Sequence, residues 1–237
     1  MSRYIDLERY HRVEQTHPFY KEMVSKIISE VTSRSKAKKT DVIELGAGTG
    51  LLTQELLKIP SISPIVLEMD SNCVSALKNN LAAGRKIKVV RCDMINYFNG
   101  SKFDIAVSSF SHHHAEYDRG LEFAMNINKN LKPKGVYIVG EELIPKFLSE
   151  KDRKRSLKKY HSFIIRKAIS EAHHEVAELE KAALESGLNK IGDFKRHEKM
   201  LEDEMCSSGF KIITKQKIGP INKNVGGVFV YVFQKTN

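Results

Sequence analysis

The sequence predicts an α/β protein with a doubly wound, mostly parallel seven-stranded sheet, a C-terminal antiparallel hairpin and a helical insertion. Between residues 41 and 140, short apolar runs alternate with stretches of helical periodicity, the rhythm of parallel βαβ units. These runs are apolar almost throughout, which is typical of strands covered on both faces. A long helical stretch and two more strand-like runs complete the chain.

Length and composition indicate a globular protein of one ordinary α/β domain. The chain has 237 residues, of which 41% are apolar and 29% charged. It has no apolar run of the roughly 18 residues that a membrane span needs, and its charged start lacks the apolar stretch of a signal peptide. We therefore expect a cytoplasmic protein. The net charge of +10 attracts anions but does not choose between nucleic acid, phosphate and an acidic metabolite.

The elements before the insertion follow from local patterns. Residues 4–33 predict helix, with a break at His17-Pro18 because the residue before proline disfavours helix. Strands are expected at 41–45, 65–68, 88–91, 103–108 and 136–140, helices at 51–58, 72–83 and 117–131, and a turn at 132–135.

Residues 146–208 predict a helical lid between the fifth strand and the hairpin. Apolar residues three or four apart between Tyr160 and Ala183 form one stripe, which is also a candidate homodimer surface. The hairpin strands are expected at 210–217 and 227–234. We expect residues 1–145 and 209–237 to form the main domain.

A glycine-rich turn provides the clearest functional signal. Gly46, Gly48 and Gly50 stand where a strand ends and a helix begins, so the backbone can bend and a ligand can approach it closely. The dinucleotide spacing G-x-G-x-x-G is absent, because Leu51 occupies the place of the third glycine. Glu44 suits the cationic end of S-adenosylmethionine (SAM), which carries no pyrophosphate.

Acidic residues follow the next two strands. Glu68 ends the second strand, where a carboxylate can accept from both hydroxyls of a ribose. Asp93 follows the third strand and can accept from an adenine amino group while Met94 packs on the ring. Asp70 is an alternative to Glu68, and each acid could instead cap a helix.

Together these motifs resemble class I SAM-dependent methyltransferases of the small-molecule type. The segments that carry the resemblance are V-I-E-L-G-A-G-T-G, I-V-L-E-M-D, R-C-D-M, F-D-I-A-V-S-S and L-K-P-K-G-V-Y-I-V. It implies a Rossmann-like sheet, with the glycine loop facing the methionine part of SAM. The cofactor-binding residues expected from it are Glu44, Gly46, Gly48, Gly50, Glu68, Met69, Asp93, Met94 and Ser109.

The acceptor is expected beyond the fourth and fifth strands. Many small-molecule methyltransferases have a histidine pair at the place of His113 and His114, which makes this pair the candidate catalytic base. Capping or packing is the alternative role. Adjacent histidines on a short turn rarely face one ion, so no metal site is predicted.

Substrate contacts are expected from the fifth strand and the lid. Glu141 and Glu142 should follow the strand and face one crevice. The substrate-binding candidates are Glu141, Tyr160 and Arg166. Further lid candidates are His161, Phe163, His173 and His174.

A narrower resemblance, to carboxy-SAM synthases, rests on the insertion and its G-D-F-K-R segment at 192–196. The G-x-G-x-G loop departs from what that family usually keeps. The leading hypothesis is methyl transfer to a small molecule by in-line displacement. The alternatives are a carboxy-SAM synthase-like or RNA-pathway enzyme and a non-catalytic SAM-binding protein. The acceptor atom stays open.

Overall fold

The computed structural model describes residues 6–35, 39–81 and 87–236. The strands are β1 (Thr40–Leu45), β2 (Ile62–Glu68), β3 (Lys88–Arg91), β4 (Phe103–Ser109), β5 (Leu131–Leu143), β6 (Phe210–Gly219) and β7 (Gly227–Lys235). They form one seven-stranded sheet in the order β3-β2-β1-β4-β5-β7-β6. The strand β7 runs opposite to the other six and pairs antiparallel with both β5 and β6. The predicted fold class is therefore confirmed.

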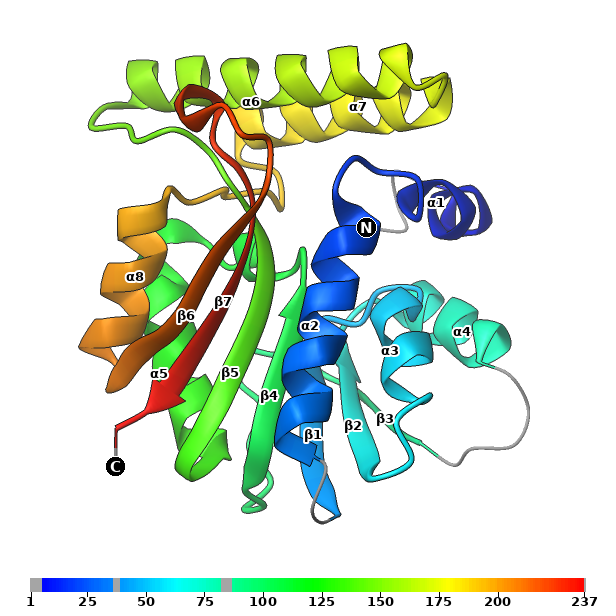
Figure 1. Cartoon of the computed structure of the whole chain (residues 1–237), viewed down its shortest axis with the longest axis vertical. Coiled ribbons are helices and arrows are strands. Elements are labelled where there is room, and N and C mark those ends of the chain that lie inside the picture. The colour runs from blue at the N-terminus through cyan, green and yellow to red at the C-terminus, as the bar shows by residue number, and fades with distance from the viewer. Residues whose placement is uncertain (1–5, 36–38, 82–86, 237) are drawn as a thin grey trace.

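Helices cover both faces of the sheet and the carboxyl ends of its strands (Figure 1). The helices are α1 (Leu7–Glu14), α2 (Tyr20–Ser35), α3 (Leu51–Leu56), α4 (Ser71–Asn80), α5 (Gly120–Asn130), α6 (Glu150–Ser170), α7 (His174–Asn189) and α8 (Glu198–Ser207). Apolar residues of α2 and α3 pack on one face, and those of α5 and α8 pack on the other. The paired helices α6 and α7 lie across the strand ends, at the top of Figure 1.

The N-terminal helices break where the sequence predicts. The helix α1 begins after Asp6, whose carboxylate accepts from the backbone N–H groups of Glu8 and Arg9. It ends before His17-Pro18, and α2 begins at Tyr20. Parts of two predictions lie outside the described residues: the start of the first helix at 4–5 and the end of the helix expected over 72–83.

The fifth strand differs from the prediction at both ends. The expected turn at 132–135 lies inside β5, where the pairing with β4 slips between Phe103 and Ile105, and Lys134 takes a φ of 60°. At the other end, pairing with β7 extends β5 to Leu143. Glu141 and Glu142 therefore belong to the strand instead of following it, and successive strand residues project to opposite faces.

Residues 146–208 contain three helices: α8 packs on the sheet, while α6 and α7 pack together where the sequence shows one stripe. The chain reverses at Ala172, which has a φ of 61°, so the stripe is divided between α6 and α7. Arg153 joins the two helices by donating to the backbone oxygen of Gly187 at 2.7 Å. The stripe residues Tyr160 and Ile164 are fully buried within the chain. The predicted domain division and the homodimer through this segment stay predictions.

In the described ranges, no helix combines the length and apolar character needed to cross a membrane.

Gly140 sets the distance between α2 and the sheet. A Cβ added there would stand 2.5 Å from Met23 Sδ and 2.8 Å from Ile27 Cδ1, and both side chains are fully buried. We expect Gly140→Ala to lower the free energy of unfolding by about 1–3 kcal/mol in urea titrations, because the core must shift. In a Met23→Ala background the same substitution should cost less. Equal costs in both backgrounds would contradict this packing.

Candidate functional site

The glycine loop adopts the backbone that its sequence favours. Gly46, Gly48 and Gly50 have φ angles of +69°, +55° and +93°, in the region that residues with a Cβ rarely adopt. A Cβ at Gly46 would stand 2.8 Å from Cβ of Ser111, so packing excludes one there. A Cβ at Gly48 would meet nothing within 4 Å. The main chain at Gly48 therefore faces open space.

Glu68 is fixed at the edge of this space. Its Oε2 accepts from the Gly48 N–H and its Oε1 from the Asp70 N–H, both at 2.8 Å. An ionised carboxylate has about four acceptor positions, so each oxygen can accept once more, enough for two ribose hydroxyls. Beside it the apolar Met69 side chain is 65% exposed. These groups fit the adenosine part of SAM.

Glu44 lies beneath the loop. It is buried, and its Oε2 accepts from Thr53 Oγ1 at 2.7 Å. Burial raises the pKa of Glu44 to about 8, and the charge of Glu68 adds to that rise. The carboxyl is therefore largely protonated at neutral pH in the ligand-free protein. A cationic group beside it would favour the charged form.

The three remaining cofactor candidates all have partners within the chain, and for Ser109 the partner is Tyr20, through a side-chain hydrogen bond. Asp93 accepts from the Ile95 N–H at 2.9 Å and from Asn96 Nδ2 at 3.1 Å, which fixes the turn after β3. Met94 contacts the glycine loop, because its Sδ would lie 3.4 Å from a Cβ at Gly46. Ser109 is half-buried at the end of β4. The cofactor roles of these residues stay predictions.

The helix α1 connects the glycine loop with the helical insertion. His11 Nδ1 lies 2.9 Å from Thr49 Oγ1 in the loop. Arg9 and Arg12 both form ion pairs with Glu175 on α7, at 3.1 Å. The N-terminal helix is thus held between the loop and the lid.

The predicted catalytic histidines have different surroundings. His113 is buried and its Nδ1 lies 2.6 Å from Glu141 Oε1. Burial opposes ionisation of both groups, but their mutual attraction outweighs it, raising the pKa of His113 and lowering that of Glu141 to about 2. His114 is exposed and its Nδ1 donates to the backbone oxygen of Gly192 at 2.6 Å. His113 and Glu141 form an ion pair, while Nδ1 of His114 is engaged by the Gly192 carbonyl.

Glu142 projects to the opposite face of β5 from Glu141 and contacts a second group of buried polar side chains. Tyr160 donates to its Oε1 at 2.6 Å, Lys195 lies 3.0 Å from its Oε2, and His17 lies 3.4 Å from its Oε1. Behind His17, Glu180 lies 3.2 Å away. We call this group, completed by His161 beside Glu180, the Glu142 cluster.

Sequence reasoning selected only part of this cluster. Tyr160 and His161 were expected from the lid, whereas His17, Glu180 and Lys195 were missed as site residues. What distinguishes these three residues is that each carries a titratable group and is buried in the fold. A single sequence does not show which titratable residues are buried. The substrate candidate Arg166 is exposed on α6, and its role stays a prediction.

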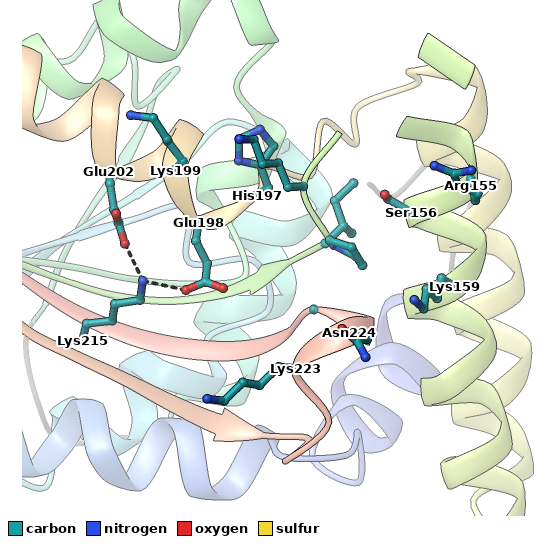
Figure 2. Close-up of a pocket in the computed structure, with 14 residues that line it drawn as sticks. Arg155, Ser156, Lys159, His197, Glu198, Lys199, Glu202, Lys215, Lys223 and Asn224 are labelled. Carbon is teal, nitrogen blue, oxygen red and sulfur yellow. Dashed lines mark hydrogen bonds and ion pairs between the residues drawn. The ribbon is translucent and has the colours of Figure 1, made fainter. Parts of the chain in front are cut away.

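A cavity of about 700 Å³ lies between α6, α8 and the β6–β7 connection (Figure 2). Its charged lining residues are Lys146, Arg155, Lys159, Glu198, Lys199, Glu202, Lys215 and Lys223. Both acids pair with Lys215, at 2.6 and 2.7 Å. The remaining charge is positive, which suits an anionic ligand.

One protein family matches the segment that forms the central part of the sheet. Residues 42–135 match the family described as methyltransferase domain. This segment contains the glycine loop, Glu68, Asp93 and the histidine turn. The prediction of a class I SAM-dependent methyltransferase domain is thereby confirmed.

A curated relative is similar over a shorter segment. Ribosomal RNA small subunit methyltransferase A of Listeria monocytogenes is 33% identical over 72 residues, which is 30% of this chain. The match spans 24% of that protein, so the chain covers about a quarter of the relative's length.

Solved structures share the fold over nearly the whole chain. A SAM-dependent methyltransferase from Clostridium acetobutylicum is 14% identical with a TM-score of 0.66, covering 96% of both chains. Magnesium protoporphyrin IX methyltransferase from Synechocystis, solved with S-adenosylhomocysteine (SAH), is 12% identical with a TM-score of 0.65, covering 96% of this chain and 93% of its own. The N-methyltransferase NodS from Bradyrhizobium japonicum is 12% identical with a TM-score of 0.61, covering 93% and 98%. At such identities the likeness shows the fold alone.

The protonated state of Glu44 makes stability depend on pH. Because its folded pKa of about 8 lies above the unfolded value, the folded state binds an extra proton, and stability falls as pH rises through that interval. Glu44→Gln removes this titration. Between pH 5 and pH 8, we expect the free energy of unfolding of the variant to rise relative to that of the parent by on the order of 1–4 kcal/mol, measured by urea unfolding without ligand. A parent–variant difference independent of pH would contradict the assignment.

Proposed function

We propose, on the premise that residues 42–135 form a class I SAM-dependent methyltransferase domain, that this chain binds SAM and transfers its methyl group to a small-molecule acceptor. The single observation that carries the proposal is the pairing of Glu68 with the open glycine loop. Glu68 is oriented by the loop's own N–H group and keeps acceptor positions for a ribose. Bound SAM supplies an electrophilic methyl group on a good leaving group, so alignment provides most of the rate.

The small-molecule acceptor is supported by the lid. The helices α6 and α7 lie across the strand ends, and Tyr160 and Lys195 close the space beside β5 with buried polar groups. Two structural relatives are an N-methyltransferase and a magnesium protoporphyrin IX methyltransferase, and the same class of acceptor is proposed here.

The His113–Glu141 pair is the proposed base for an acceptor that carries a proton. Only the neutral imidazole accepts a proton, so the pair acts as a base above the raised pKa of His113, where Glu141 holds the remaining proton on Nδ1 and Nε2 is the accepting atom. His114, next to it, is the alternative base.

Binding of SAM depends on Glu68 in this proposal. We expect Glu68→Ala to weaken binding of SAM and SAH by about 10- to 100-fold in calorimetry, because two hydrogen bonds to a charged acceptor are lost. Glu55→Gln, on neighbouring α3, is the matched control and should bind as the parent does. If Glu68→Ala binds SAM with the same affinity as the parent, the proposed cofactor site is refuted.

An RNA acceptor is the second candidate, favoured by the basic cavity and by the partial similarity to a ribosomal RNA methyltransferase. Phosphate contacts would make binding to RNA fall steeply with salt. The charge-reversal variant Lys159→Glu would then weaken tRNA binding in 50 mM salt.

Labelled SAM distinguishes the two acceptor classes. With the methyl group radiolabelled and a cell extract as acceptor source, we expect label in the low-molecular-weight filtrate, unaffected by prior ribonuclease treatment. Label that ribonuclease abolishes would favour RNA instead. SAM binding without any labelled product would favour a non-catalytic SAM-binding protein.

A further inference from the structure

Three residues of the Glu142 cluster bring their donor atoms to one point. His17 Nε2 lies 3.4 Å from Glu142 Oε1 and 3.2 Å from Glu180 Oε1. One such atom from each residue lies within 4.8 Å of the others. Within residues 6–35, 39–81 and 87–236, this is the one group of three histidine, cysteine or acidic side chains so arranged. Each of the three is at least nine-tenths buried.

The spacing of these atoms is that of ligands around a small cation. Nitrogen and oxygen ligands bind zinc at about 2.0–2.2 Å, so neighbouring ligands in a tetrahedral shell lie about 3.3–3.6 Å apart. The two separations from His17, 3.4 and 3.2 Å, are close to that range. The Glu142 and Glu180 oxygens lie within 4.8 Å of each other, and an ion at the centre would draw the two carboxylates together.

The surrounding side chains hold both carboxylates by their other contacts. Glu180 Oε2 lies 2.8 Å from His161 Nδ1, and Glu142 Oε2 lies 3.0 Å from Lys195 Nζ. Such outer partners orient ligands in metal sites. In addition, His17 Nδ1 and His161 Nε2 are buried without a hydrogen-bond partner in the described part of the chain. Five segments of the chain therefore support one preformed polar centre.

We propose that His17, Glu142 and Glu180 bind a divalent first-row transition-metal ion. The imidazole ligand suits zinc, iron or cobalt better than calcium or magnesium, which take oxygen ligands. Two carboxylates balance the charge of the ion in this buried setting. Three protein ligands are also the number that leaves a coordination position open. The histidines at 112–114 are a separate group, since His112 and His113 face Glu204 and Glu141.

The test uses the full-length chain without a histidine tag, first stripped with a chelator. Cobalt(II) is added without SAM and followed by visible absorption and calorimetry. We expect one equivalent to bind, and His17→Gln or Glu180→Gln to weaken binding by about 100-fold or more, exceeding the usual effect of losing an outer partner. The matched controls are His174→Gln and Glu185→Gln, exposed positions on α7, which should bind as the parent does. Circular dichroism confirms that each variant is folded.

Three results would overturn the site. These are no stoichiometric cobalt binding, unchanged affinity in folded His17→Gln and Glu180→Gln, and loss of binding in His113→Gln instead, which would place the ion at the histidine turn. If His17→Gln does not fold, Glu180→Gln decides. Because SAM is absent, the outcome is independent of SAM binding, which calorimetry on the same sample measures separately.

Discussion

The burial of Glu142 near the carboxyl end of β5 is the constraint on which the arrangement of the segments above the strand ends depends. A carboxylate removed from water needs charged and hydrogen-bonding partners. The sheet alone does not supply them, so they come from α6, from the segment before α8 and from the turn between α1 and α2: Tyr160, Lys195 and His17. Satisfying this one group holds both the helical insertion and the N-terminal segment over the strand ends.

The alternation of strand residues separates two buried groups that are adjacent in sequence. Glu141 faces the histidine turn and Glu142 faces the lid, because neighbouring strand residues point to opposite faces. The cofactor candidates stand further along the same edge, at β1, β2 and β3. Parallel strands bring their carboxyl ends together. The glycine loop, the His113–Glu141 pair and the Glu142 cluster therefore all lie at the carboxyl ends of the strands. The helix α1 connects its two ends through His11 and Arg9.

The sequence was sufficient for the features set by local patterns. The sheet, its C-terminal hairpin and the glycine loop follow from strand–helix alternation and from glycine's access to positive φ. The length of β5 was not predictable, because pairing with β7, some ninety residues later, extends it past Gly140. Three members of the Glu142 cluster, His17, Glu180 and Lys195, were missed for the same reason. His17 and Glu180 are 163 residues apart, and neither has a local pattern that distinguishes a buried polar residue from an exposed one.

The two ends of the described chain lie at opposite ends of the strands. The last strand, β7, runs back along β5 and ends where Gln234 pairs with Val136, at the edge away from the glycine loop. The first helix, α1, contacts that loop directly through His11. An affinity tag, fluorophore or surface linker joined after β7 is therefore remote from the cofactor and lid region. Since α1 itself contacts the loop, immobilised or labelled forms of this protein are best built from the carboxyl end.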